Sequence, residues 1–131
     1  MTPLTELLSL ALTVRHRAYA PYSNYCVGAA IATDAGVFVG CNVENASYGL
    51  CNCAERTAIF SAIAAGAKNI TAVVVATRDG GSPCGACRQV LAEFADPDCP
   101  VLCVDERGET RRETTVGDLL PHAFTPRNLM S

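Results

Sequence analysis

A run of eight residues, 70–77 (ITAVVVAT), constrains the fold of this chain more than any other segment. The run is rich in β-branched residues, and apolar and polar positions do not alternate along it. This pattern is typical of a strand that is buried on both faces of its sheet. The chain therefore needs a layer of secondary structure on each side of the sheet that contains this strand.

The segments around this strand alternate between helical and extended patterns. The predicted helices lie at residues 4–19, 53–65 and 84–95, with two short ones after the capping residues Thr115 and Thr125. The other predicted strands lie at residues 25–32, 37–39, 99–104 and about 110–113, and a loop is expected at 42–52. We therefore expect a three-layer α/β/α sandwich around a mixed five-stranded sheet, in a single domain over residues 1–131.

Charge and hydropathy exclude several classes of protein. Hydrophobic residues make up 50% of the chain and charged residues 18%, a composition that intrinsically disordered chains do not have. The 10 basic and 13 acidic residues give a net charge of −3 without a basic run, which argues against a nucleic acid polymer as partner. No apolar stretch is long enough to span a membrane, and Glu6 does not fit a secretory signal. We expect a cytoplasmic protein without a membrane partner.

The eight cysteines fall into two groups. Four lie within apolar runs, where a free cysteine packs as a small hydrophobic residue. These are Cys26, Cys41, Cys99 and Cys103. The other four are Cys51, Cys53, Cys84 and Cys87. Cys84 and Cys87 share one face of a helical first turn, and Cys53 opens the preceding helix. Since helix N-termini in a βαβ arrangement gather at one end of the sheet, we expect these three thiols to converge.

Three converging thiols predict a zinc site, with one ion per subunit, because the N-terminus of a helix favours the thiolate form. Candidates for a fourth ligand are poor. Cys51 is too close to Cys53 in the chain to reach around the ion, and His16 and His122 lie in the first helix and near the C-terminus. We expect the fourth position to hold water, as in catalytic zinc sites, and a closed structural site is the alternative. Glu55 would then lie beside that water and move its protons.

Several motifs resemble those of a known enzyme family. Residues 53–55 (CAE) and 83–87 (PCGAC) match the two zinc-binding segments of the zinc deaminases. Further segments are similar to those of the small homotetrameric cytidine deaminases, namely residues 20–23 (APYS), 27–30 (VGAA), 40–45 (GCNVEN), 53–58 (CAERTA) and 119–121 (LLP). The resemblance extends over residues 7–129. It implies a cytidine deaminase-like fold and a homotetramer with its active sites near subunit interfaces. The implied reaction is hydrolytic deamination of cytidine and 2′-deoxycytidine by a zinc-bound hydroxide, in pyrimidine salvage.

The resemblance also implies a role for each site residue. The zinc ligands are Cys53, Cys84 and Cys87. Glu55 is the proton shuttle and protonates N3 of the cytosine ring. Asn42 and Glu44 bind a ribose hydroxyl, to which an amide can donate and from which a carboxylate can accept. The charge of Glu44 also repels a nucleotide phosphate. Ala54 belongs to the substrate-binding set.

Aromatic residues complete the implied site. Tyr25 stands where relatives carry a phenylalanine packed against the pyrimidine ring, so its hydroxyl is a departure from the family. Phe124 matches an aromatic residue that covers the site of a neighbouring subunit, and Tyr48 is expected near a subunit contact. Packing within the core is the alternative role for Tyr25 and Phe124.

Arg56 has a possible role in charge balance. Three thiolates on one zinc ion give a net charge of −1, which makes bound water less acidic. We hypothesise that Arg56 donates hydrogen bonds to the ligand sulfurs and withdraws part of this charge. An ion pair at the surface or at an interface is the alternative.

Three other functions stay open from the sequence. A deaminase of a modified cytosine compound would share the chemistry, but residues 42–45 favour an ordinary ribose. A non-catalytic zinc module that binds a partner protein would need a saturated metal site. An enzyme that edits RNA or DNA is disfavoured by the acidic balance of the chain.

Overall fold

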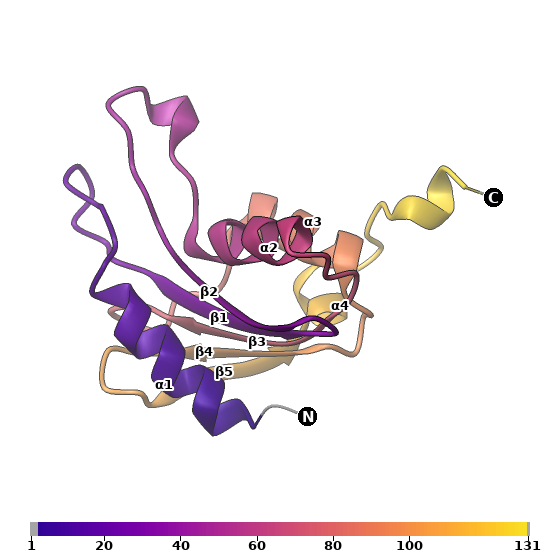
Figure 1. Ribbon diagram of the computed structural model, residues 1–131, viewed down its shortest axis with the longest axis horizontal. Helices are drawn as coiled ribbons and strands as arrows, with labels where there is room; N and C mark the ends of the chain where they lie inside the picture. The colour runs from indigo at the N-terminus through magenta and orange to yellow at the C-terminus, as the bar shows by residue number, and fades with distance from the viewer. Residues whose placement is uncertain (1–2, 131) are drawn as a thin grey trace.

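The computed structural model describes residues 3–130, and its elements follow the predicted order (Figure 1). The strands are β1 (Gly28–Thr33), β2 (Gly36–Cys41), β3 (Ile70–Ala76), β4 (Pro100–Val104) and β5 (Thr110–Thr115). The α-helices are α1 (Leu4–Arg15), α2 (Ala54–Ala64), α3 (Gly85–Phe94) and α4 (Val116–Leu119). Two short 3₁₀ helices lie at Tyr48–Leu50 and Pro126–Asn128. None of the helices described is long and apolar enough to cross a membrane.

The five strands form one mixed sheet in the order β2-β1-β3-β4-β5. Strand β1 is antiparallel to both β2 and β3, β3 is parallel to β4, and β4 is antiparallel to β5. Because β2 and β3 are both antiparallel to β1, they run in the same direction and end at the same edge of the sheet. Gly28 accordingly lies opposite Cys41 at the end of β2 and opposite Ala76 at the end of β3.

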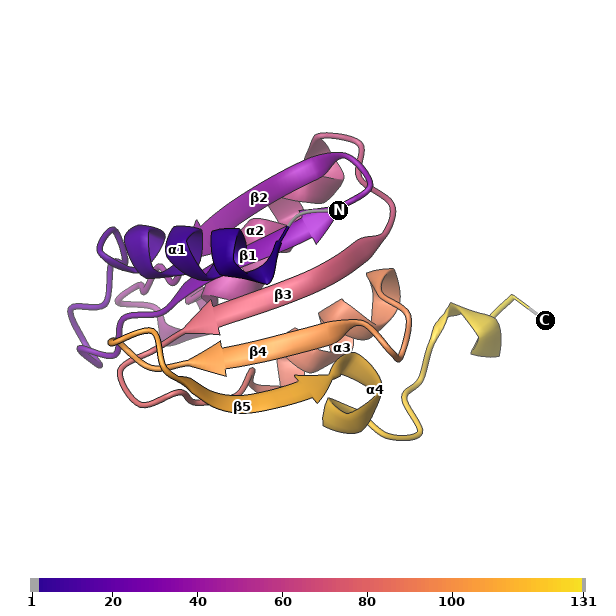
Figure 2. The same ribbon diagram turned by 90° about the horizontal axis from the view of Figure 1, so that it is seen from below.

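Helices cover both faces of the sheet, so the predicted three-layer sandwich is confirmed. Figures 1 and 2 show α1 on one face and α2 and α3 on the other. Successive side chains of β3 enter two separate cores. Val73 and Val75 pack with Ile59 of α2, whereas Val74 packs with Leu7 of α1. Burial on both faces, which the β-branched run predicted, is therefore what makes β3 the central strand.

The first helix is shorter than predicted. It ends at Arg15, whereas the apolar spacing suggested an end near Tyr19. The backbone N–H of Tyr19 donates to Asn42, and its carbonyl accepts from Glu44, so that Tyr19 forms an isolated bridge with Val43. This pairing with the segment after β2 replaces the last predicted turn of the helix. The sequence also predicts that the hydroxyl of Thr2 caps this helix, and Thr2 lies outside the described residues.

Close contact between β2 and α2 fixes where α2 begins. A methyl group added to Gly40 of β2 would lie 2.5 Å from the carbonyl oxygen of Ala54 and 2.5 Å from the amide nitrogen of Ala58. Only a residue without a side chain allows the backbone of the helix to approach the strand this closely. Gly40 therefore sets the position of the first turn of α2.

We expect Gly40→Ala to lower the free energy of unfolding by about 1–3 kcal/mol, because the methyl group meets backbone atoms that cannot rotate away. Urea denaturation measures the change. Gly49→Ala is the control, since a methyl group there meets no atom within 4 Å, and it should change stability by less than about 0.5 kcal/mol. Equal effects of the two substitutions would show that the β2–α2 contact is not constrained at Gly40.

Candidate active site

Two helices begin at the same edge of the sheet, and a cysteine precedes each of them. Cys53 is the N-cap residue of α2, and Cys84 is the N-cap residue of α3. Both have extended backbone conformations, and neither side chain caps its helix. Cys87 lies in the first turn of α3. Because β2 leads to α2 and β3 leads to α3, the shared direction of these strands brings the two helix N-termini together.

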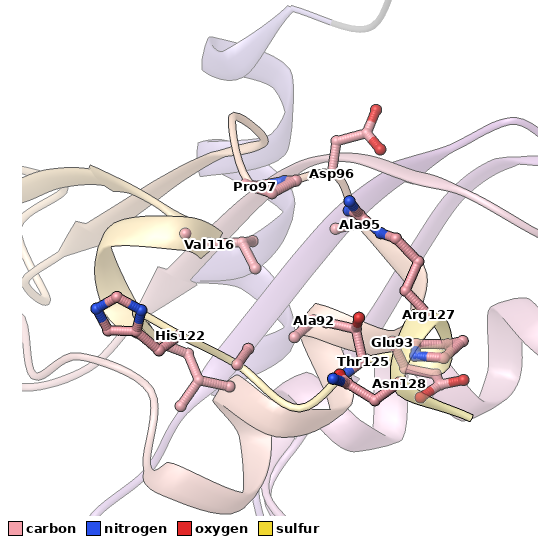
Figure 3. A pocket seen from close by; sticks show the side chains of 14 residues that line it. Ala92, Glu93, Ala95, Asp96, Pro97, Val116, His122, Thr125, Arg127 and Asn128 are labelled. Carbon is pink, nitrogen blue, oxygen red and sulfur yellow. The ribbon is translucent and has the colours of Figure 1, made fainter. Parts of the chain in front are cut away.

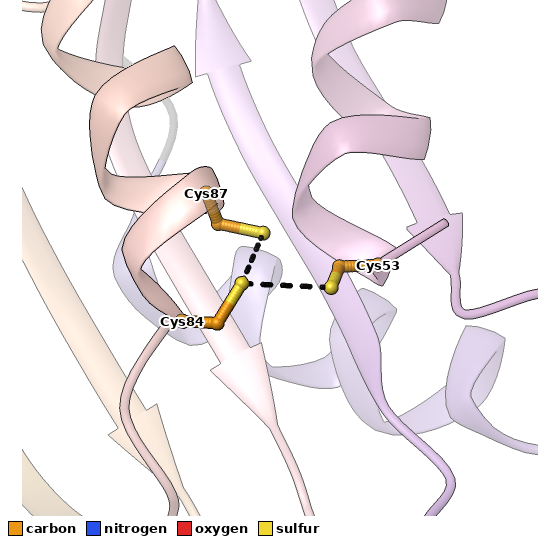
Figure 4. Close-up of side chains that lie close together, drawn as sticks. All are labelled: Cys53, Cys84 and Cys87. Atoms are coloured by element: carbon orange, nitrogen blue, oxygen red, sulfur yellow. Dashed lines mark hydrogen bonds between the residues drawn. The ribbon is translucent and has the colours of Figure 1, made fainter. Parts of the chain in front are cut away.

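The three sulfur atoms converge as the sequence predicted (Figure 4). Cys84 Sγ lies 3.7 Å from Cys53 Sγ and 3.5 Å from Cys87 Sγ, and all three are within 4.8 Å of one another. None of these cysteines forms a disulfide. Zinc binds thiolate sulfur at about 2.3 Å in tetrahedral geometry, which places two ligand sulfurs about 3.8 Å apart. The donor set and its spacing therefore fit a zinc ion.

No further ligand joins this cluster within residues 3–130, where Cys53, Cys84 and Cys87 form the one group of potential metal ligands. Cys51 lies apart from it: its sulfur accepts from the backbone N–H of Asn45 at 3.3 Å and faces the carbonyl of the same residue at 3.7 Å. Three protein ligands leave a position for water, as in catalytic zinc sites.

The protonation of Cys53 reflects its neighbours. Hydrogen bonds from the Cys87 thiol and from Arg56 lower the pKa of Cys53 to about 5. The same contact raises the pKa of Cys87, whose proton is shared with the Cys53 thiolate. One thiolate is thus stable before any metal binds. Because zinc binds the thiolate form, metal binding releases the remaining thiol protons.

Glu55 lies in the first turn of α2 with only 4% of its surface exposed. Burial raises the pKa of its carboxyl group to about 7, and the negative charge at Cys53 acts in the same direction. A carboxyl group in this environment can both release and accept a proton near neutral pH.

Arg56 contacts the cysteine cluster directly. Its Nη2 atom donates a hydrogen bond to Cys53 Sγ at 3.3 Å, and this contact raises the pKa of the guanidinium. Its Nε atom is buried without a hydrogen-bond partner among the described residues. The guanidinium therefore lies against the ligand sulfurs and forms no salt bridge with a carboxylate within residues 3–130.

A cavity of about 310 Å³ opens beside the cysteines. This volume is at the lower end of the range of small-molecule sites. The sequence predicted seven of its lining residues, namely Tyr25, Asn42, Glu44, Cys53, Ala54, Glu55 and Cys84. The sequence predicted no site role for the other six, which are Ser23, Val27, Val75, Thr77, Gly81 and Ser82. Three signals were available, since Ser23 belongs to the APYS motif, Val27 begins the VGAA motif and Ser82 precedes the PCGAC motif.

Asn42 holds another part of the cavity wall. Its Oδ1 atom accepts from the backbone N–H of Val27 at 2.8 Å, and its Nδ2 atom donates to the carbonyl of Tyr25 at 2.8 Å. The amide thus fixes the backbone before β1, and one Nδ2 hydrogen is left over for a ligand.

Glu44 holds the neighbouring turn. Its carboxylate accepts from the backbone N–H groups of Tyr22 at 3.0 Å and Ser23 at 3.2 Å, and also from the Ser23 hydroxyl. These bonds, above all the one from the hydroxyl, lower the pKa of Glu44 and keep it ionised. The cavity therefore has a fixed negative charge in its wall at Glu44.

Phe124 does not reach this cavity within its own chain. Its side chain is 58% exposed, and its carbonyl accepts a hydrogen bond from Gln89 of α3 at 2.8 Å. The C-terminal segment borders a different hollow, of about 630 Å³, whose walls include Glu93, His122 and Arg127 (Figure 3). His122 is accordingly not a member of the cysteine cluster.

The sequence matches a family model described as the cytidine and deoxycytidylate deaminase zinc-binding region, over residues 1–103. That span includes all three cysteines of the cluster and Glu55. A cytidine deaminase from Sporosarcina psychrophila is 46% identical over 127 residues, which cover 95% of this chain and 93% of the relative.

Two crystal structures have the same fold. A cytidine deaminase from Burkholderia pseudomallei aligns with a TM-score of 0.87 at 52% identity, over 94% of this chain and all of that one. A cytidine deaminase from Mycobacterium tuberculosis aligns with a TM-score of 0.80 at 38% identity, over 95% of this chain and 98% of that one.

A pair of substitutions two residues apart tests the ligand set. We expect wild type and Cys51→Ser to retain about one zinc ion per subunit, and Cys53→Ser to retain less than about one-tenth of that after dialysis against a chelator. The reason is that Cys53 supplies one of three thiolates, whereas Cys51 bonds to Asn45. Atomic absorption measures the metal content. Loss of zinc from Cys51→Ser would instead indicate a closed site with four thiolates.

Proposed function

This chain belongs to the cytidine deaminase family and is a zinc-dependent hydrolytic deaminase of cytidine, and we propose that it also converts 2′-deoxycytidine to 2′-deoxyuridine, in pyrimidine salvage. The reaction on cytidine consumes one water molecule and yields uridine and ammonia. The proposed unit is a single domain over residues 1–131.

One observation carries the proposal for the reacting centre. The buried carboxyl group of Glu55 and the sulfurs of Cys53 and Cys84 line the same cavity, with Cys87 completing the metal-binding cluster. Zinc held by these three cysteines would act as a Lewis acid, which lowers the pKa of water so that hydroxide is available as a nucleophile near neutral pH.

Glu55 moves the protons of the reaction in this proposal. Its carboxylate takes a proton from the attacking water and delivers it to N3 of the cytosine ring, so that C4 becomes electrophilic. The water oxygen bonds to C4, and the same carboxyl group then carries the remaining water proton to the exocyclic nitrogen, so that the C4–N bond breaks, a carbonyl forms at C4 and ammonia leaves. A pKa near 7, caused by burial, suits a group that must accept and release protons in turn.

Asn42 and Glu44 bind the sugar in this proposal. The free Nδ2 hydrogen of Asn42 donates to a ribose hydroxyl, and the Glu44 carboxylate accepts from one. Their fixed positions support this role, because each is held by backbone groups of residues 22–27. The charge of Glu44 disfavours a substrate that carries a phosphate. Ala54 and Tyr25 complete the wall around the base.

Arg56 offsets the charge of the ligand set. Three thiolates and one divalent ion leave a net charge of −1, and the guanidinium neutralises it through its hydrogen bond to Cys53 Sγ. Its buried Nε atom, which has no other partner, supports a role that is tied to this cluster.

We further propose a homotetramer in which Phe124 closes the cavity of a neighbouring subunit. Phe124 is exposed and remote from the cavity of its own chain, and Tyr48 and Phe60 are exposed apolar side chains available for subunit contacts. A cytoplasmic location accords with eight cysteines that form no disulfides. No nucleic acid polymer and no membrane is among the proposed partners.

Glu55→Gln tests the proton shuttle. We expect the variant to retain zinc and to lose about 10²- to 10⁴-fold in kcat, because an amide cannot transfer protons between water and N3. Ammonia release from cytidine and metal content are measured on the same sample. Glu6→Gln is the control, since Glu6 also lies in the first turn of a helix but is exposed on α1. Retained activity in Glu55→Gln would exclude Glu55 as the shuttle.

Arg56→Ala tests the charge balance. We expect a loss of about 10- to 100-fold in kcat and a shift of the acid limb of the pH–rate profile to higher pH. The sign follows because uncompensated thiolate charge makes water at the site less acidic. Lys68→Ala removes an exposed positive charge near the start of β3 and should change neither quantity. An unchanged kcat and pH profile in Arg56→Ala would reduce Arg56 to a packing residue.

A further inference from the structure

The wall of the cavity formed by Tyr25 is braced from outside the cavity. The phenol oxygen of Tyr25 donates a hydrogen bond to Asp79 Oδ1 at 2.7 Å, between residues 54 positions apart in the chain. The guanidinium of Arg78 lies over the ring, 5.2 Å from its centroid, within the range of a cation–π contact. Tyr25 lines the cavity, whereas Arg78 and Asp79 do not. Neither residue faces the cavity, so each acts on it through the residues that it contacts, Tyr25 first among them.

The ring of Tyr25 needs this brace because its backbone belongs to no helix or strand. The segment between α1 and β1 is irregular, and Asn24 adopts a left-handed conformation with a φ of 57°. The backbone of Tyr25 is held at two points, where its N–H donates to Ser23 Oγ at 3.0 Å and its carbonyl accepts from Asn42. These bonds fix the start of the side chain, and the contact with Asp79 fixes its far end.

The loop that carries Asp79 is itself held in place. Buried Thr77 accepts hydrogen bonds from the backbone N–H groups of Gly80 at 2.7 Å and Gly81 at 2.9 Å, and its hydroxyl lies 3.4 Å from Asp79 Oδ1. The backbone of Asp79 also forms an isolated bridge with Asp105. A methyl group on Gly81 would lie 2.7 Å from the Tyr25 hydroxyl. The phenol end of Tyr25 thus sits against a backbone that leaves it little room to move.

We infer that Asp79 is a positioning residue, which orients the ring of Tyr25 as the wall against which the cytosine ring of the substrate packs. This inference rests on the proposed function, because it assigns the base to the part of the cavity that Tyr25 shares with Glu55. The protonation states agree with it. Burial is the main cause that raises the pKa of Tyr25, and the hydrogen bond from Tyr25 is the main cause that lowers the pKa of Asp79. A neutral phenol and an ionised carboxylate form a charge-assisted bond.

Steady-state kinetics on four variants of the full chain tests the inference. We expect Tyr25→Phe and Asp79→Ala each to raise KM for cytidine and the inhibition constant of uridine about three- to tenfold, with kcat within about twofold, because the bond acts on binding of the ring. The double variant should be no worse than either single one, since both remove the same contact. Asp79→Asn should stay within about twofold of wild type, because its amide oxygen still accepts from the phenol.

Asp34→Ala serves as the control for a structural effect. Asp34 is an exposed carboxylate that accepts from the backbone N–H groups of Lys68 and Asn69, before the start of β3 and so at the end of that strand away from the cysteines. Its loss should lower thermal stability without changing KM. The inference is overturned if Asp79→Ala leaves KM unchanged, if the effects of Tyr25→Phe and Asp79→Ala multiply, or if kcat falls instead.

Failure of the proposed function has a different signature. A zinc-loaded wild type that releases no ammonia from cytidine would contradict the proposed function alone. Calorimetric dissociation constants for cytidine across the same variants would then decide the role of Asp79 without any turnover. Equal dissociation constants for wild type and Asp79→Ala would overturn it.

Discussion

The shared direction of β2 and β3 is the constraint on which the rest of the site depends. Both strands end at one edge of the sheet, and each leads into a helix whose N-cap residue is a cysteine. The backbone contact at Gly40 sets the depth of α2 on the sheet. Three sulfurs consequently meet at spacings that a tetrahedral metal requires, although Cys53 and Cys84 are 31 residues apart. The metal centre is a product of sheet topology.

Groups of opposite charge lie within four consecutive residues at the start of α2. Cys53, Glu55 and Arg56 occupy the N-cap and first turn of α2, where a thiolate, a buried carboxyl group and a guanidinium share one environment. Burial raises the pKa of the Glu55 carboxyl group to about 7, whereas Arg56 stabilises the Cys53 thiolate. Helical spacing separates the two functions, because Arg56 contacts the sulfur while Glu55 faces the cavity. One helical turn thus brings together a metal-ligating sulfur and the carboxyl group that we propose as the proton shuttle.

The part of the cavity wall that contains Tyr25, Asn42 and Glu44 is built differently, from irregular segments that hold one another. Asn42 and Glu44 follow β2 and bond to the backbone of residues 22–27, which in turn carries Tyr25. Asp79, after β3, then fixes the phenol. Asn42 and Glu44 have two roles, since they hold the loop in place and also line the cavity. The proposed substrate-binding residues are therefore held by contacts between loops, whereas the cysteine cluster and Glu55 are placed by regular elements.

The sequence by itself determined the order of elements, the doubly buried β3 and the group of Cys53, Cys84, Cys87 and Glu55. The elements follow from periodicity, the pairs Cys84–Cys87 and Cys53–Glu55 from spacing within one helical turn, and the meeting of the two pairs from the gathering of helix N-termini at one end of a βαβ sheet. The sequence placed the end of α1 four residues too late, since pairing of Tyr19 with Val43 ended the helix. Only the tertiary structure decided that Asn42 and Glu44 brace a loop, that Thr77 and Gly81 line the cavity and that Asp79 holds Tyr25. Such contacts join segments tens of residues apart, and no local pattern encodes which loops meet once the sheet has formed.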